Sequence, residues 1–181
     1  VVIVHRSRVE VDQGGVTFHE QVDVPRQLDD LPRVGVSFDL PASHTRVEWM
    51  GLGPHETYPD RHLAQRRRWR SSVEDLYVDL VHPQEHGHRH DSDWVTFGSG
   101  DRGLRIVADR RFGWNASHHS LASLTAARHT TDLAPDDGVH VIIDVAHRGL
   151  GTASCGPDTL PRYLVGGGRY RWSWRIEARP T

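Results

Sequence analysis

The amino-acid sequence predicts an all-β protein built as an antiparallel sandwich. Apolar residues recur at every second position along several short segments, as they do in strands with one buried face. Glycine and proline separate those segments, and many short strands with such breaks are typical of a sandwich. Helical spacing is scarce: Leu121, Leu124 and Ala127 fit one short helix, with Ser120 as its N-cap.

The first two strands are expected to form a hairpin. Residues 1–11 are rich in valine, Gly14 and Gly15 suit a tight turn, and residues 16–24 alternate again. Residues 25–32 have proline at both ends and are expected to form a loop. Six further strands are expected at residues 34–40, 45–52, 93–97, 103–108, 139–145 and 170–178.

Tryptophans lie within several of these strand patterns. Trp49 is in the strand expected at 45–52, and Trp172 and Trp174 are in the last one. Core packing is the expected role of all three, whereas an exposed tryptophan would suit sugar binding. Since no low-complexity linker divides the sequence, we expect a single domain over residues 1–181.

The composition excludes several classes of function. With 36% hydrophobic and 25% charged residues the chain is globular, and a net charge of −2 gives no reason to expect nucleic acid or a membrane surface as a partner. The triplet Arg66–Arg68 is therefore interpreted as solvated surface. No apolar run approaches the roughly 18 residues of a membrane span. The single cysteine, Cys155, rules out an internal disulfide and favours a reducing compartment, so we expect a cytoplasmic protein.

One stretch carries a resemblance to a known family. Residues 47–61, VEWMGLGPHETYPDR, closely resemble part of the C-terminal β-sandwich, or small-chain region, of the large bacterial β-galactosidases of glycoside hydrolase family 2. Further matching blocks follow in the family's order: PQEHGHR at 83–89, WNAS at 114–117, DVAHRGLG at 144–151 and GRYRWSW at 168–174. The resemblance therefore covers essentially the whole chain.

The resemblance implies a fold and a division of labour. The fold is an antiparallel supersandwich, similar to galactose mutarotase, and a full copy is longer than this chain, so we expect a partial domain without its N-terminal strands. In the family, a separate TIM barrel carries the catalytic pair of glutamates and binds magnesium and sodium. We therefore expect a segment with no catalytic residue and no cofactor of its own, inactive alone, in an enzyme that hydrolyses terminal β-D-galactosides such as lactose.

The loop at residues 149–161 is the candidate site for substrate. In the family it reaches the mouth of the active site, where the best-known member has a tryptophan that supports the aglycone sugar. This chain has Ser154, Cys155 and Gly156 there, followed by Asp158. The resemblance thus implies an aglycone subsite without an aromatic platform. The alternative is a purely structural loop.

The family motif at residues 53–61 is expected to organise contacts between domains. Its polar residues are Glu56, Tyr58, Asp60 and Arg61, and we expect a charge-assisted pair between the last two. An acid/base pair of His55 and Glu56 is the alternative, but adjacent residues point apart on an extended chain.

A second motif could suggest a metal site. His86, His88 and His90 alternate and would share one face of a strand. The family match uses the other set of positions, so we expect these histidines to face solvent, with no metal bound. Glu85 and Arg89 are expected either to form a structural ion pair or to anchor the backbone of the turn.

Two other functions remain as alternatives. A stand-alone carbohydrate-binding module would need an exposed aromatic platform, and a mutarotase-like aldose epimerase would need a histidine and a carboxylate that converge in a pocket. In each interpretation carbohydrate is the ligand. In the preferred one, the barrel of the same enzyme is the partner. Unpaired strand edges in a partial sandwich also predict a homo-oligomer or a marginally stable fragment.

Overall fold

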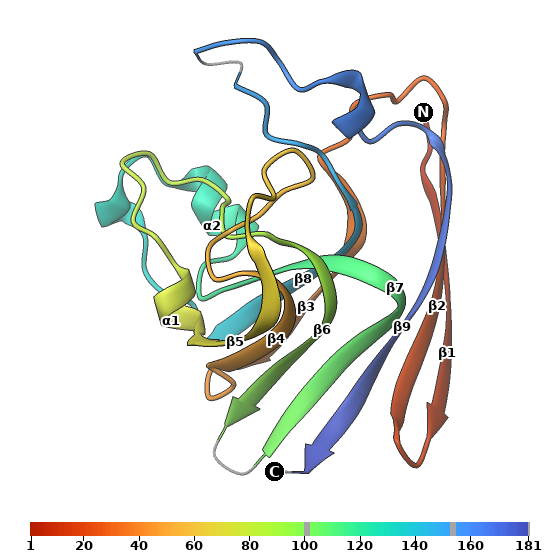
Figure 1. Ribbon diagram of the computed structural model, residues 1–181, viewed down its shortest axis with the longest axis vertical. Helices are drawn as coiled ribbons and strands as arrows, with labels where there is room; N and C mark the ends of the chain where they lie inside the picture. The colour runs from red at the N-terminus through yellow and green to blue at the C-terminus, as the bar shows by residue number, and fades with distance from the viewer. Residues whose placement is uncertain (100–101, 153–154, 181) are drawn as a thin grey trace.

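The computed structural model describes residues 1–99, 102–152 and 155–180 (Figure 1). Nine strands in these ranges form one antiparallel sheet. Their bounds are β1 Val4–Asp12, β2 Gly15–Val24, β3 Arg33–Pro41, β4 Arg46–Gly53, β5 Gln65–Ser72, β6 Arg89–Ser99, β7 Arg102–Ser117, β8 Gly138–His147 and β9 Gly168–Pro180. The helical turns are α1 Val73–Leu76, α2 Leu121–Ala126, η1 Thr130–Asp132 and η2 Pro161–Tyr163. The all-β prediction is confirmed.

Strand β7 makes the sheet branch. Its first part, residues 102–108, pairs with β9, and its last part, residues 113–117, pairs with β8. One path through the sheet runs β1-β2-β9-β7-β6-β4-β5, and the β3–β8 pair leaves it at β7. In Figure 1, β7 bends sharply near its middle, between these two partners. The bend lets two parts of one sheet face each other as the layers of a sandwich.

Aromatic rings fill the space between the layers. Trp174 on β9 stacks on Phe18 of β2 at 4.3 Å and on Phe38 of β3 at 5.5 Å, measured between ring centroids. A second group centres on Trp114, which contacts Trp49 edge-on at 5.4 Å. Trp49, Trp172 and Trp174 are all buried, as the strand patterns predict.

Most expected elements are present, with longer bounds. The helix is α2, and the hydroxyl of Ser120 accepts the Ser123 backbone N–H as its N-cap. Strand β5 was not predicted, because its sequence contains the triplet Arg66–Arg68 in place of alternating apolar residues. It forms because the strand pairs with β4, where Glu48 accepts hydrogen bonds from Arg68 and Arg70. The triplet is thus part of the sheet as well as solvated surface.

The two edge strands of the path β1-β2-β9-β7-β6-β4-β5 differ in their exposure. Every residue of β1 is exposed, and β2 is the only strand that pairs with it among the described residues. At the other end, β5 pairs with β4 and keeps its long arginine side chains outward. No helix in the described ranges has the length and hydropathy to cross a membrane.

Candidate functional site

Hydrogen bonds join three segments that are far apart in the sequence. The backbone N–H of Thr57 donates to the carbonyl of His88 at 2.8 Å, and the N–H of Gly87 donates to the Glu56 carboxylate at 2.9 Å. The Asp60 carboxylate accepts the N–H groups of Leu150 and Gly151, at 3.0 and 2.8 Å. The motif loop at 53–61 therefore holds both other segments, residues 87–88 and 150–151, through hydrogen bonds.

Asp60 clamps the start of the 149–161 loop rather than pairing with Arg61. Arg61 lies 3.1 Å from the carboxylate of Glu56, so the expected Asp60–Arg61 pair is wrong. Neighbouring side chains leave this turn in different directions, which separates the two charges. Gly149 has to be glycine here, because a Cβ would lie 2.6 Å from the Asp60 carboxylate.

Arg148 fixes the same loop from the other side. Its guanidinium donates to Asp30, to Asp158 at 3.1 Å and to the hydroxyl of Thr159 at 2.6 Å. The N–H of Thr159 and the Arg148 guanidinium together hold the pKa of Asp158 below its usual value. Asp158 is thus an anchor of the loop. Cys155 is exposed at its turn.

The remaining loop residues complete the comparison with the sequence. Gly156 is exposed next to Cys155, whose N–H donates to the carbonyl of Thr152 at 2.8 Å. Ser154, the fourth predicted site residue, lies outside the residues that the structure describes. The described part of the loop exposes Leu150 and Leu160 beside its small side chains, and it contains no aromatic ring.

Glu85 and Arg89 do not form an ion pair, but Arg89 anchors the backbone of the turn, which was the other arrangement that the sequence suggested. Glu85 pairs with Arg33. Arg89 is buried, donates to the carbonyl of Gly87, and lies 5.8 Å from the ring centroids of both Trp49 and Trp114. Gly87, with φ of +87°, turns the chain between the two residues, so their side chains diverge.

His88 is the largest departure from the sequence prediction. It was expected to face solvent, yet it is 1% exposed, while His86 and His90 are half-buried. Its ring lies 4.1 Å from that of His147 and 5.5 Å from that of Tyr58, between centroids. Burial lowers the pKa of His88 well below its ordinary value, so the imidazole is neutral.

Strand β8 supplies two more groups to this position. Asp144 places a carboxylate oxygen 3.4 Å from Nδ1 of His88, and suitable ligand atoms of His88, Asp144 and His147 all lie within 4.8 Å of one another. Burial raises the pKa of Asp144 to about 7, although the nearby guanidinium of Arg33 acts in the opposite direction.

A β-bulge explains why sequence reasoning missed this cluster. On a regular strand, residues 144 and 147 point to opposite faces. Here Val34 pairs with Ala146 and Gly35 with Asp144, so Val145 is an extra residue that reverses the alternation. Both side chains therefore reach the same side. The family block at residues 144–151 was the only sequence feature that included both Asp144 and His147. It did not indicate that their side chains meet.

Comparison with known proteins identifies the family. The model of the β-galactosidase small chain matches residues 3–176. The chain belongs to the β-galactosidase small-chain family. It is 34% identical to a β-galactosidase of Aeromonas hydrophila over 175 residues, which are 93% of this chain and 16% of that protein.

Other relatives give the same picture of the small-chain domain. It is 36% identical to a β-galactosidase of Leuconostoc mesenteroides over 84% of this chain and 15% of that protein, and 37% identical to one of Arthrobacter sp. strain B7 over 75% and 14%. The chain thus spans about a sixth of the length of these curated relatives.

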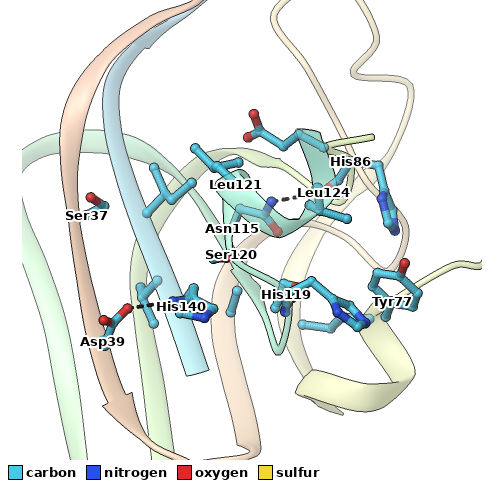
Figure 2. Close-up of a pocket in the computed structure, with 16 residues that line it drawn as sticks. Ser37, Asp39, Tyr77, His86, Asn115, His119, Ser120, Leu121, Leu124 and His140 are labelled. Atoms are coloured by element: carbon cyan, nitrogen blue, oxygen red, sulfur yellow. Dashed lines mark hydrogen bonds and ion pairs between the residues drawn. The ribbon is translucent and has the colours of Figure 1, made fainter. Parts of the chain in front are cut away.

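The small-chain domain also contains a pocket of about 180 Å³ beside α2 (Figure 2). Asp39 of β3 and His140 of β8 lie on one side of it, and Tyr77, His86 and His119 on the other. Both nitrogens of the His140 ring bind carboxylates, at 2.6 and 2.7 Å. Polar groups in the pocket can hydrogen-bond to a small ligand, but the ring nitrogens of His140 and His86 are already engaged.

Proposed function

We propose that this chain is the non-catalytic small-chain segment of a β-galactosidase that hydrolyses terminal β-D-galactosides such as lactose. Family membership over residues 3–176 supports this assignment, as does the small share of each relative that the chain covers. The catalytic glutamates and the magnesium and sodium sites of the parent enzyme would then lie in its barrel. The lone exposed cysteine fits a bacterial cytoplasm.

The observation that carries the proposal is the double anchoring of the 149–161 loop. Asp60 holds its first residues, and Arg148 ties Asp158 and Thr159 to Asp30. A loop fixed on a rigid sheet suits the shaping of a neighbouring site. We propose that its turn, with Ser154, Cys155 and Gly156, borders the aglycone side of the active site in the barrel. Asp158 acts there by keeping the turn in place.

Two alternatives fit less well. A carbohydrate-binding module needs an exposed aromatic platform, and each aromatic ring of the described chain is buried or half-buried. A mutarotase-like epimerase needs a histidine that can take up a proton. Both ring nitrogens of His140 are already bound to the carboxylates of Asp39 and Asp136, so this histidine is not free to accept a proton from a sugar.

A chimera tests the proposal. The matching segment of the Arthrobacter sp. strain B7 β-galactosidase is replaced by this chain, and hydrolysis of lactose is measured. We expect activity in the chimera and none in the 181-residue chain alone. Asp60→Asn should raise KM for lactose by about tenfold, equivalent to ~1.4 kcal/mol, because one of the two loop hydrogen bonds is lost. Asp29→Asn, at an exposed carboxylate, is the control and should leave KM unchanged. Turnover by the isolated chain would refute a non-catalytic role.

The same chimera tests the aglycone side. Cys155→Trp restores an aromatic face on the loop, which should tighten the binding of glucose as an acceptor by ~1 kcal/mol, or about fivefold. Transglycosylation rates measured against glucose concentration give this affinity. If Cys155→Trp leaves it unchanged, the loop does not border the acceptor sugar.

A further inference from the structure

Three buried polar atoms around His88 have no hydrogen-bond partner among the described residues. They are Nδ1 and Nε2 of His88 and Oδ1 of Asp144. The ring is 1% exposed, as is the carboxylate-bearing residue, so bulk water does not reach either group. Buried polar groups in native proteins nearly always have partners, and a cluster of orphans indicates a bound ion or ordered water.

We propose that His88, Asp144 and His147 bind a divalent transition-metal ion, with Zn²⁺ as the best match. Two imidazole nitrogens and one carboxylate oxygen form a donor set that this ion favours. The ligand atoms lie within 4.8 Å of one another, a spacing that one ion can bridge after small side-chain rotations. This departs from the expectation that the chain binds no metal.

The orientation of His147 supports the site. Its Nδ1 lies 2.7 Å from the carbonyl oxygen of Arg148, so Nδ1 carries the proton and donates it. Nε2 is then left with a free lone pair. A histidine that binds a metal through one nitrogen commonly donates the other N–H to a backbone carbonyl, which fixes the ring.

Glycines on both neighbouring strands make room for these side chains. Gly113 of β7 and Gly35 of β3 each pair with Asp144 on β8. A Cβ on Gly113 would lie 2.2 Å from the His88 ring, and one on Gly35 would lie 2.4 Å from Oδ1 of Asp144. The sheet therefore accommodates the imidazole and the carboxylate inside its core, next to the bulge that turns His147 toward them.

A cation that binds Asp144 competes for this carboxylate with one guanidinium. Arg33 lies 3.4 Å from Asp144, and it also pairs with Glu85. When a metal takes the Asp144 carboxylate, Arg33 keeps Glu85 as its counter-ion. The ring nitrogens of His88, which have no hydrogen-bond partner among the described residues, are available as ligand atoms.

The set of three alternating histidines at 86, 88 and 90 is not the site. His86 accepts the backbone N–H of Val78 at Nε2, at 3.0 Å, and its Nδ1 lies 3.1 Å from the carbonyl of Gln84. Both of its nitrogens are thus engaged. Only His88 of the motif contributes, and its co-ligands come from β8.

Metal titration of the 181-residue chain tests the proposal. After treatment with a chelator, the chain is titrated with Zn²⁺ by calorimetry and with Co²⁺ by absorption spectroscopy. We expect one ion per chain, with Co²⁺ absorption typical of nitrogen and oxygen ligands. Asp144→Asn and His147→Gln each remove one donor and should weaken binding by at least about 100-fold, beyond the 10–100-fold cost of losing an outer-shell partner. His82→Gln, at an exposed histidine, is the matched control.

The outcomes separate this site from binding by surface histidines. Binding that survives in both Asp144→Asn and His147→Gln, or that is lost in His82→Gln, overturns the proposal. Circular dichroism checks that each variant folds. If the variants unfold, the unmodified chain decides alone: Zn²⁺ must raise its melting temperature and Mg²⁺ must not. An equal response to both ions, or none, refutes the site. These measurements need no turnover, so they are independent of the proposed role in a β-galactosidase.

Discussion

Arg89 keeps a guanidinium inside the core, where its planar group lies between the rings of Trp49 and Trp114. Burial lowers the pKa of Arg89 to about 10, which leaves it charged at neutral pH. We predict that Arg89→Lys lowers the free energy of unfolding by about 2 kcal/mol or more, because an ammonium neither stacks nor reaches the Gly87 carbonyl in the same geometry. Arg67→Lys, at an exposed guanidinium over Trp69, should change it by less than about 0.5 kcal/mol. Equal effects in urea denaturation would contradict this.

His140 links stability to pH. Burial alone would lower its pKa, but hydrogen bonds to Asp39 and Asp136 outweigh burial and raise it above 6.5. A raised pKa in the folded state stabilises the protein fully below the unfolded value, and this stabilisation is lost as pH rises through the folded value. We predict that His140→Gln destabilises the chain more at about pH 6 than at about pH 9, by ~0.5–1 kcal/mol. Urea melts at both values check this, with His82→Gln as a control that should show no such difference.

Among the elements, β8 depends on its bulge and on the glycines beside it. The alternation of residues 139–145 predicts the strand correctly, but no periodicity shows that Val145 is an extra residue. Whether a strand bulges depends on the register of its partner, and that register is set by contacts more than 100 residues away in the sequence. For the same reason β5 escapes prediction: its arginines are ordered by Glu48 on β4.

This dependence can be measured at Gly113. A methyl group there would lie 2.2 Å from the buried His88 ring, so we predict that Gly113→Ala costs about 1–3 kcal/mol of unfolding free energy through overpacking. Gly168→Ala is the matched control on β9, where an added Cβ meets nothing within 4 Å; it should be neutral or stabilising by up to about 1 kcal/mol. Calorimetric melting of both variants decides. If both variants lose a similar free energy of unfolding, the cost comes from the backbone conformation of strand glycines and not from contact with His88.

For the whole molecule, the sequence predicts the fold class better than it predicts which strands pair with one another. Period-two patterns identify the strands because each has one face toward the core, and the buried tryptophans follow from the same patterns. The branch at β7 could not be read in this way, since both parts of that strand look alike in sequence and differ only in their partners. The candidate site shares this limit. Residues of the motif loop were found, but their true partners, such as Leu150 for Asp60, come from other strands and loops.

The exposed edge of β1 sets the behaviour of the whole chain in solution. Val9 and Val11 lie on one side of this strand, 51% and 76% exposed, next to unpaired backbone groups. An open edge that exposes these valines favours pairing with a second strand, so we predict that the isolated chain self-associates. In sedimentation velocity, Val9→Lys with Val11→Lys should shift it toward the monomer, because lysine on an edge strand opposes pairing. Val78→Lys with Val81→Lys makes the same chemical change at exposed positions outside the strands and should leave association unchanged. A chain that is monomeric without substitution would show that β1 needs no partner.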